Sequence, residues 1–267
     1  MSDLKNKKII ITGGLGLMGI SLVENLAKDG AKIIILDLKS VSFIKKIKNY
    51  RQIKNNLTYF RCDVSEKKQL LKVKKKIFGK FNKIDVLINA AALNDAVENK
   101  GNLRSSMFEN YSVNDWNKSI KSNLTSIFLC CQIFGSKMIK QKEGSIINIA
   151  STYGIVAPDQ RIYTDKKSKQ IFYKNPSYST TKSGVIGFTK YLASYWGKVG
   201  IRVNSISPGG IQNKQNKEFI KKYSSKTLLN RMAMPHEIYG IVKLLCTQDS
   251  SYITGSNIVV DGGWTAI

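Results

Sequence analysis

The sequence predicts an α/β fold, in which helices cover both faces of one doubly wound parallel sheet of about seven strands. Short apolar runs rich in β-branched residues recur along the chain, as expected for buried parallel strands. Segments with helical periodicity separate these runs, and such alternation is typical of parallel sheets. The 267 residues suffice for one large domain, and no repeat or linker divides them, so we expect a single domain over residues 1–267.

The expected elements follow one another in a regular order. Expected strands cover residues 8–12, 33–36, 57–61, 84–88, 144–150, 201–207 and 257–260. The first expected helix follows the glycine-rich turn and ends at residue 28. The others cover about 66–81, 113–140, 176–196 and 235–246. Asp29-Gly30 ends the first helix, and Ser112-Val113-Asn114-Asp115 is typical of a capping box at the start of the third.

The first strand runs directly into a glycine-rich turn and a helix. Gly14, Gly16 and Gly19 form G-x-G-x-x-G in this strand–turn–helix setting, where glycine permits a tight turn and lets a pyrophosphate approach the helix N-terminus. Asp37 ends the second strand, eighteen residues beyond Gly19. A carboxylate there accepts hydrogen bonds from a ribose and repels a 2′-phosphate. We therefore expect a Rossmann-type dinucleotide site that prefers NAD to NADP.

A tyrosine and a lysine share one face of the expected helix that begins at Pro176. Tyr178 and Lys182 are four residues apart, which places them side by side on a helix. A neighbouring ammonium favours the phenolate, so we expect a lowered pKa at Tyr178 and proton exchange with a substrate oxygen. Ser151 follows the fifth strand, at the sheet edge where ligands bind, and can donate to that oxygen. Asn123 lies among apolar neighbours, where a structural hydrogen bond and a functional role are equally compatible with the sequence.

Along essentially its whole length the chain resembles the short-chain dehydrogenase/reductase family. The resemblance rests on Thr12 to Gly19, Asp37, Asp63-Val64, Asn89-Ala90-Ala91-Ala92, Asn123, Ser151, Tyr178, Lys182, Pro208-Gly209 and Asp261-Gly262-Gly263. It implies that Tyr178 is the general acid/base, and that Lys182 lowers the pKa of Tyr178 and binds the ribose of the cofactor. It also implies that Ser151 polarises the reacting carbonyl and that Asn123 anchors a water of the proton relay. It also implies cofactor contacts from Thr12, Gly14, Gly16, Leu17, Met18, Gly19, Asp37, Asp63, Val64, Asn89, Ala90, Tyr178, Lys182, Pro208, Gly209 and Ile211.

Two departures from the family pattern concern the cofactor end. Leu17 occupies the middle glycine position of the short form, and the spacing of Gly16 resembles the extended branch of nucleotide-sugar epimerases and dehydratases. The chain length and the Pro208-Gly209 and Asp261-Gly262-Gly263 segments favour the short form. The usual Asn-Asn-Ala-Gly is replaced by Asn89-Ala90-Ala91-Ala92, which predicts a slightly different wall beside the cofactor ring.

A third departure is an insertion of roughly residues 158–175, which separates Ser151 from Tyr178 by about twice the family's usual distance. It carries Arg161, Tyr163, Tyr173 and several lysines, groups that suit a sugar bearing phosphate or nucleotide. We expect this segment to form part of the substrate site; the alternatives are a surface elaboration or a subunit contact. Residues 154–163 also resemble members found in bacterial surface-sugar and flagellin-glycan pathways.

The resemblance implies reversible hydride transfer between NAD and a secondary alcohol/ketone pair. A sugar or nucleotide-sugar, most simply an anionic sugar derivative, is the leading substrate class. One alternative is reduction of a 3-oxoacyl thioester, which Asp37 disfavours because reductive biosynthesis usually draws on NADPH. Another is a catalytically idle NAD- or nucleic-acid-binding protein of the same fold, which the complete Asn123, Ser151, Tyr178 and Lys182 set disfavours.

Composition limits the partners and the compartment. The net charge of +25 is spread along the chain, and 37 lysines against 6 arginines indicate solvated surfaces rather than a nucleic-acid site. Four cysteines without ligand spacing and a single histidine predict reduced core thiols and no metal. The polar start and the absence of a long apolar run predict a cytoplasmic protein without a membrane segment. The family resemblance implies a homotetramer or homodimer.

Overall fold

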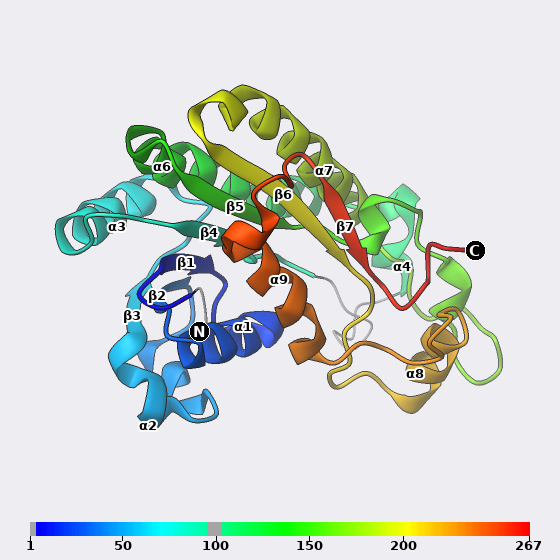
Figure 1. Cartoon of the computed structure of the whole chain (residues 1–267). Coiled ribbons are helices and arrows are strands. Elements are labelled where there is room, and N and C mark those ends of the chain that lie inside the picture. Colours follow the sequence, from blue (N-terminus) through cyan, green and yellow to red (C-terminus); the bar gives the residue numbers. More distant parts are fainter. Residues whose placement is uncertain (1–3, 95–102) are drawn as a thin grey trace.

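A computed structural model describes residues 4–94 and 103–267 of the chain. Seven parallel strands form one sheet in the order β3-β2-β1-β4-β5-β6-β7 (Figure 1). The strands are β1 Lys8–Thr12, β2 Lys32–Asp37, β3 Leu57–Arg61, β4 Val86–Asn89, β5 Gly144–Ile149, β6 Ile201–Pro208 and β7 Asn257–Val260. The predicted fold class is therefore confirmed.

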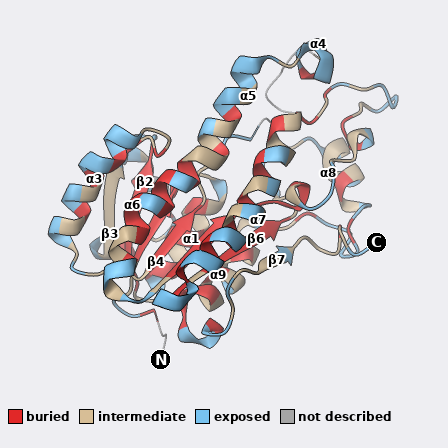
Figure 2. Cartoon of the chain, turned by 90° about the horizontal axis from the view of Figure 1, so that it is seen from above, coloured by how far each residue is buried: buried red, intermediate tan, exposed pale blue. Residues whose placement is uncertain are grey.

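Helices cover both faces of the sheet because alternate residues of each central strand point to opposite faces. On one face Ile10 packs under the helices α3 Lys67–Lys80, α6 Ser126–Gln141 and α7 Pro176–Trp196. On the other face Ile9 and Ile11 pack under α1 Leu17–Lys28 and α9 Tyr239–Cys246. The central strands are buried, while the helices packed on them carry exposed residues on their outer sides (Figure 2). Cys62, Cys130, Cys131 and Cys246 are buried and unpaired, as expected for core thiols.

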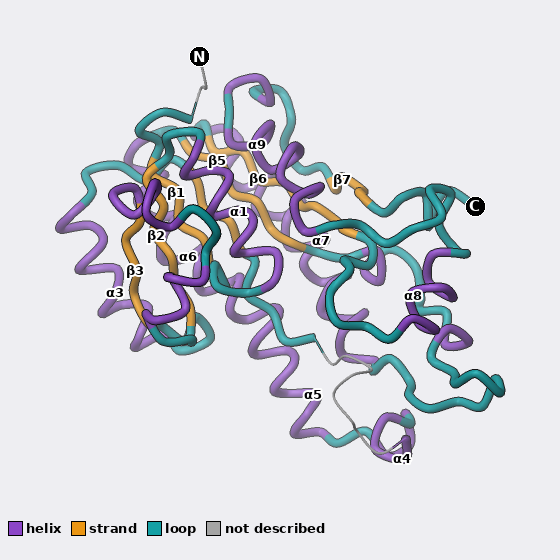
Figure 3. Tube along the Cα trace, turned by 90° about the horizontal axis from the view of Figure 1, so that it is seen from below, coloured by secondary structure: helices purple, strands orange, loops and turns teal. Residues whose placement is uncertain are grey.

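Shorter helices lie outside these layers. They are α2 Tyr50–Ile53, α4 Leu103–Ser106, α5 Val113–Ile120 and α8 Lys217–Ser224. Helices α4 and α8 lie beyond one end of the sheet, away from its central strands (Figure 3). Helix α8 was not predicted, because this stretch of the sequence is lysine-rich and Tyr223 is the only residue of the helix that is buried.

The helix predicted over about 113–140 is not regular throughout. Helix α5 is joined to α6 by a π-helical segment, Lys121–Thr125, and Asn123 lies at its centre. Such wide turns are uncommon and are frequently found at functional sites. Among the described residues, no helix is long and apolar enough to cross a bilayer.

The order of the strands fixes where a ligand can bind. The chain leaves β1 toward β2 on one side, whereas β4 lies on its other side, so a crevice opens beyond the carboxyl ends of β1 and β4. The predicted site residues Thr12, Asn89 and Pro208 all stand at strand ends of this edge.

Candidate active site

The glycine turn after β1 is too tight to accept side chains at two positions. Gly13 has φ +65°, and a Cβ there would lie 2.7 Å from the Cα of Ala91. A Cβ on Gly19 would collide with the carbonyl oxygen of Gly13 and come within 2.8 Å of Gly14. Gly13 was not singled out from the sequence, although it precedes the G-x-G-x-x-G motif directly. Helix α1 begins at Leu17 without an acidic residue in its first turn, which suits a bound pyrophosphate.

Side chains at the ends of β1 and β4 fix this turn against the sheet. The Thr12 hydroxyl accepts hydrogen bonds from the backbone N–H groups of Ala90 and Ala91, both at 3.1 Å. Asn89 is buried at the end of β4, where its amide nitrogen donates to Asn148 Oδ1 at 2.8 Å. Thr12 and Asn89 therefore hold the cofactor edge together from within the protein.

The predicted acidic residue of the second strand lies beside the glycine turn. Asp37 ends β2 and is largely buried. Its Oδ2 accepts from the backbone N–H of Leu15 at 2.8 Å, and its Oδ1 accepts from that of Lys39 at 2.9 Å. Each carboxylate oxygen keeps a second lone pair, so the group can still accept from a ribose hydroxyl. Asp63, at the end of β3, instead bonds locally to the backbone and hydroxyl of Ser65.

The start of α7 brings Tyr178 and Lys182 to the crevice. Asn175 caps this helix by accepting from the backbone N–H of Tyr178 at 3.0 Å, and Pro176 occupies its first turn, where no N–H is needed. Lys182 is buried and donates to the backbone oxygen of Ile149 at 2.8 Å. Its ammonium lies 5.7 Å from the centre of the Tyr178 ring.

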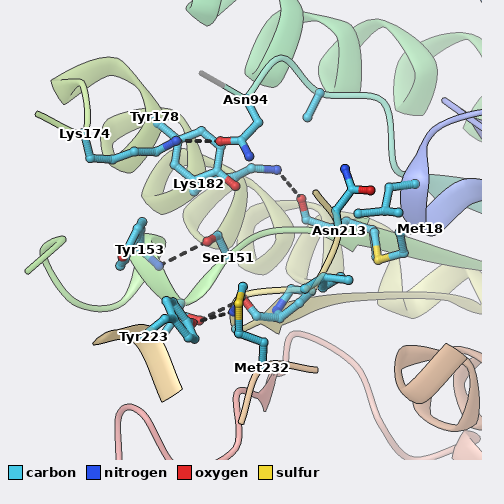
Figure 4. Close-up of a pocket in the computed structure, with 18 of the residues that line it drawn as sticks. Met18, Asn94, Ser151, Tyr153, Lys174, Tyr178, Lys182, Asn213, Tyr223 and Met232 are labelled. Carbon is cyan, nitrogen blue, oxygen red and sulfur yellow. Dashed lines mark hydrogen bonds between the residues drawn. The ribbon is translucent and has the colours of Figure 1, made fainter. Parts of the chain in front are cut away.

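Ser151 completes the group from the opposite side of the crevice. It follows β5, and its hydroxyl accepts from the backbone N–H of Tyr153 at 3.2 Å (Figure 4). The Ser151 hydroxyl also acts on Tyr178, where it lowers the pKa of the phenol. The hydroxyls of Ser151 and Tyr178 thus lie on one cavity, where a carbonyl oxygen can bind, and Lys182 lines the same cavity.

Burial, however, shifts the pKa of Tyr178 in the direction opposite to the one expected from the sequence. Desolvation raises the pKa of Tyr178 and outweighs the hydrogen bond from Ser151. Desolvation also lowers the pKa of Lys182 to about 8. The sequence-based expectation of a lowered Tyr178 pKa is therefore wrong for the protein as described. A neutral phenol is a proton donor, which suits protonation of a carbonyl oxygen during reduction.

These residues surround a cavity of about 340 Å³. The predicted site residues that line it are Leu17, Met18, Ala90, Ser151, Tyr178, Lys182, Pro208, Gly209 and Ile211. The other predicted residues, namely Thr12, Gly14, Gly16, Gly19, Asp37, Asp63, Val64, Asn89 and Asn123, do not reach its wall in the described part of the chain. Sequence reasoning did not assign roles to Tyr153, Lys174, Asn213, Tyr223 and Met232, which also line it.

The chain matches the family model described as short chain dehydrogenase over residues 7–224. The protein is a short-chain dehydrogenase/reductase. It is 31% identical to the 3-oxoacyl-acyl-carrier-protein reductase FabG of Aquifex aeolicus, over 97% of this chain and 98% of the relative. It is 28% identical to a D-threitol dehydrogenase of Mycolicibacterium smegmatis, over 98% and 94%. A short chain dehydrogenase of Leptospira borgpetersenii, solved with bound NAD+, superposes with a TM-score of 0.86 at 33% identity, over 98% of this chain and 94% of that one.

The family identifies this short-chain dehydrogenase as an NAD(P)-dependent oxidoreductase. Its own geometry fits such a cofactor, because Gly13 and Gly19 permit the tight turn that carries the chain from β1 into the N-terminus of α1, where a pyrophosphate can bind. No group of three or more His, Cys, Asp or Glu side chains in residues 4–94 and 103–267 is placed to hold a metal.

In this short-chain dehydrogenase Asn123 holds the loop that follows β4. Its side chain accepts from the backbone N–H of Leu93 at 2.7 Å and donates to the Leu93 oxygen at 3.0 Å. The π-helical turn lets this fully buried amide face the loop. The sequence left a structural bond and a functional role open for Asn123, and the structure shows the structural bond.

The insertion contributes to the cavity through only some of the residues that the sequence suggested. Tyr163 and Lys174 line the cavity, whereas Arg161 is exposed and pairs with Asp159. The segment is fixed to α8 by Lys222, which donates to the backbone oxygen of Thr164 at 2.9 Å.

Proposed function

We propose that this enzyme interconverts a secondary alcohol and a ketone on a sugar or nucleotide-sugar, with Tyr178 as the proton donor and acceptor. The convergence of Ser151, Tyr178 and Lys182 on one cavity carries the proposal. Ser151 donates to the reacting oxygen and orients it, while Tyr178 transfers the proton. Lys182 binds the ribose of the cofactor, and Asn123 keeps the β4 loop in place. The bound dinucleotide supplies or accepts the hydride.

The polar groups of the cavity support a hydroxylated substrate. Asn94 and Asn213 line it with amide groups, and the insertion adds the Tyr163 phenol to its wall. The threitol dehydrogenase among the relatives acts on a polyol by its name. A substrate that carries phosphate or nucleotide also fits the net charge of +25, and bacterial surface-sugar pathways are one source of such compounds.

Reduction of a 3-oxoacyl thioester is the second candidate. Several bacterial relatives, including those of Thermotoga maritima and Aquifex aeolicus, carry the name of that activity at 29% and 31% identity. The raised pKa of the Tyr178 phenol also suits the reductive direction. A thioester on a carrier protein needs an open approach, whereas the insertion adds Tyr163 and Lys174 to the cavity wall.

The deciding experiment follows NADH and NADPH absorbance with three substrate panels: polyols, phosphorylated or nucleotide-activated sugars, and 3-oxoacyl thioesters. The Tyr178→Phe protein serves as the blank. We expect turnover with a member of the sugar panels that the blank lacks. Turnover restricted to thioesters would replace the sugar proposal by the second candidate.

We further propose NAD as the preferred cofactor. The Asp37 carboxylate is held beside the glycine turn by two backbone N–H groups, where it would repel a 2′-phosphate. In fluorescence titrations we expect NADH to bind about tenfold more tightly than NADPH, a difference of about 1.4 kcal/mol. Asp37→Asn retains an oxygen acceptor but removes the charge, so it should narrow this ratio. Equal binding of both cofactors to the unmodified protein would contradict the role given to Asp37.

The protein is also proposed to form a homo-oligomer, a dimer or a tetramer. The outer face of α7 carries a row of stacked rings: Phe188, Tyr191 and Tyr195, of which the last two are 60% and 67% exposed. Phe128 of α6 packs against Phe188 and extends this surface. An apolar aromatic face of this kind favours association with a second copy. Light scattering in solution measures the assembly directly.

A further inference from the structure

A second lysine lies against the ring of Tyr178. Lys174, the second residue before α7, has its ammonium 4.2 Å from the centre of that ring, closer than the 5.7 Å of Lys182. The Lys174 ammonium lies between the Tyr178 ring and Asn94, whereas that of Lys182 is directed to the backbone oxygen of Ile149 (Figure 4). Lys174 belongs to the insertion, so the residue spacing between Tyr178 and Lys182 does not reveal it.

Several contacts hold Lys174 in this position. The side chain of Gln160 accepts from its backbone N–H at 2.9 Å and donates to its backbone oxygen at 3.1 Å. Its ammonium donates to Asn94 Oδ1 at 2.5 Å, and only 7% of the residue is exposed. The placement is therefore built by the fold of the insertion and does not depend on a mobile surface chain.

Apart from Lys174 and Lys182, the titratable groups named here that face Tyr178 are phenols, which carry no positive charge. The facing titratable side chains are Tyr153, Tyr163 and Tyr223, from three different segments, and burial raises the pKa of each phenol. Asp159 faces Tyr153 and Tyr163, but it is paired with Arg161 and Lys226. Among these described neighbours, the phenols stay neutral near neutral pH.

We propose that Lys174 is a second cationic partner of Tyr178, a positioning residue that stabilises the phenolate formed in each turnover. In reduction, the substrate carbon gains a hydride, the O–H bond of Tyr178 breaks, and the proton binds the new alkoxide. The phenolate charge that remains spreads over the ring, and the Lys174 ammonium lies over that ring. In alcohol oxidation the same charge must exist beforehand, so the effect is greatest there. This inference rests on the proton-transfer role proposed for Tyr178 but not on the identity of the substrate.

The test compares Lys174→Met, which keeps length but removes charge, with Lys174→Arg, which keeps the charge. We expect Lys174→Met to raise the apparent pKa in the pH profile of kcat for alcohol oxidation by about one unit. At a pH below the apparent pKa of both proteins, a shift of this size lowers kcat about tenfold and leaves KM little changed. Lys174→Arg should restore most of the rate. Lys169→Met, an exposed charge of the same insertion, is the matched control and should match the unmodified protein.

A second readout needs no substrate. The phenolate absorbance of Tyr178 is the difference between each protein and its Tyr178→Phe counterpart, followed with pH while circular dichroism shows the fold intact. The proposal predicts less phenolate at a given pH in Lys174→Met, even if the substrate proposal fails. An unchanged pKa in Lys174→Met, or a loss confined to KM, would overturn it and assign Lys174 to substrate binding. If Lys174→Met does not fold, Lys174→Gln, which can still donate to Asn94, takes its place.

Discussion

Replacing Tyr178 with phenylalanine is expected to lower kcat by about 10³-fold, in line with the loss of a positioned general acid/base. The ring keeps its packing and its contact with the Lys174 ammonium, because only the hydroxyl is removed. Ser151 remains, but its aliphatic hydroxyl is a much weaker acid than a phenol and is a poor proton donor. Steady-state rates at saturating substrate and cofactor measure the effect.

Cofactor binding separates this chemical effect from a structural one. The dissociation constant of NADH should change less than about threefold in Tyr178→Phe, well under 1.4 kcal/mol. Tyr252→Phe is the matched control, since this tyrosine is fully exposed and lies outside the cavity wall. A Tyr178→Phe protein that keeps the normal rate would refute proton transfer by Tyr178.

The second large effect concerns the glycine turn. Gly19→Ala should weaken NADH binding by at least about tenfold and lower the free energy of unfolding by about 1–3 kcal/mol, as overpacking does. The new Cβ would overlap the carbonyl oxygen of Gly13 and lie 2.8 Å from Gly14, and both are backbone atoms that cannot rotate away. Denaturant unfolding and NADH fluorescence measure the two consequences.

Gly187→Ala provides the control for this change. Gly187 lies within α7, and a Cβ there would have no atom within 4 Å. Because alanine favours a helix more than glycine does, Gly187→Ala should raise the free energy of unfolding by about 1 kcal/mol. The same substitution of glycine by alanine is thus expected to lower the free energy of unfolding at position 19 and to raise it at position 187. If Gly19→Ala bound NADH as well as the unmodified protein, the turn would not be the pyrophosphate site.

The parts of the site that depend on short-range pattern were predictable from the sequence. The spacing of Tyr178 and Lys182 fixes one helical face, and the apolar runs that precede Thr12 and Ser151 place both at strand ends. These predictions need only the periods of helix and strand, and the rule that ligands bind at carboxyl ends of parallel strands.

Other features depend on contacts between distant segments. Lys174 reaches Tyr178 only because Gln160 and α8 determine the path of the insertion. The π-helical turn at Asn123 accompanies its bonds to Leu93, thirty residues earlier in the chain. The raised pKa of Tyr178 comes from burial, which cannot be predicted from the spacing between Tyr178 and Lys182. The sequence identifies such residue types, but not the neighbours that change their chemistry.

The buried ammonium of Lys182 also links the active site to protein stability. Its pKa is about 8 in the folded protein against 10.5 for a free lysine side chain, so between these values the unfolded chain binds one more proton at this residue. Unfolding takes up that proton, and the Lys182 contribution to stability therefore rises with pH across this interval, by up to roughly 3 kcal/mol. At neutral pH the folded state carries the full cost of desolvating this charge. The residue that serves turnover is thus a source of thermodynamic weakness, and alkaline solution relieves it.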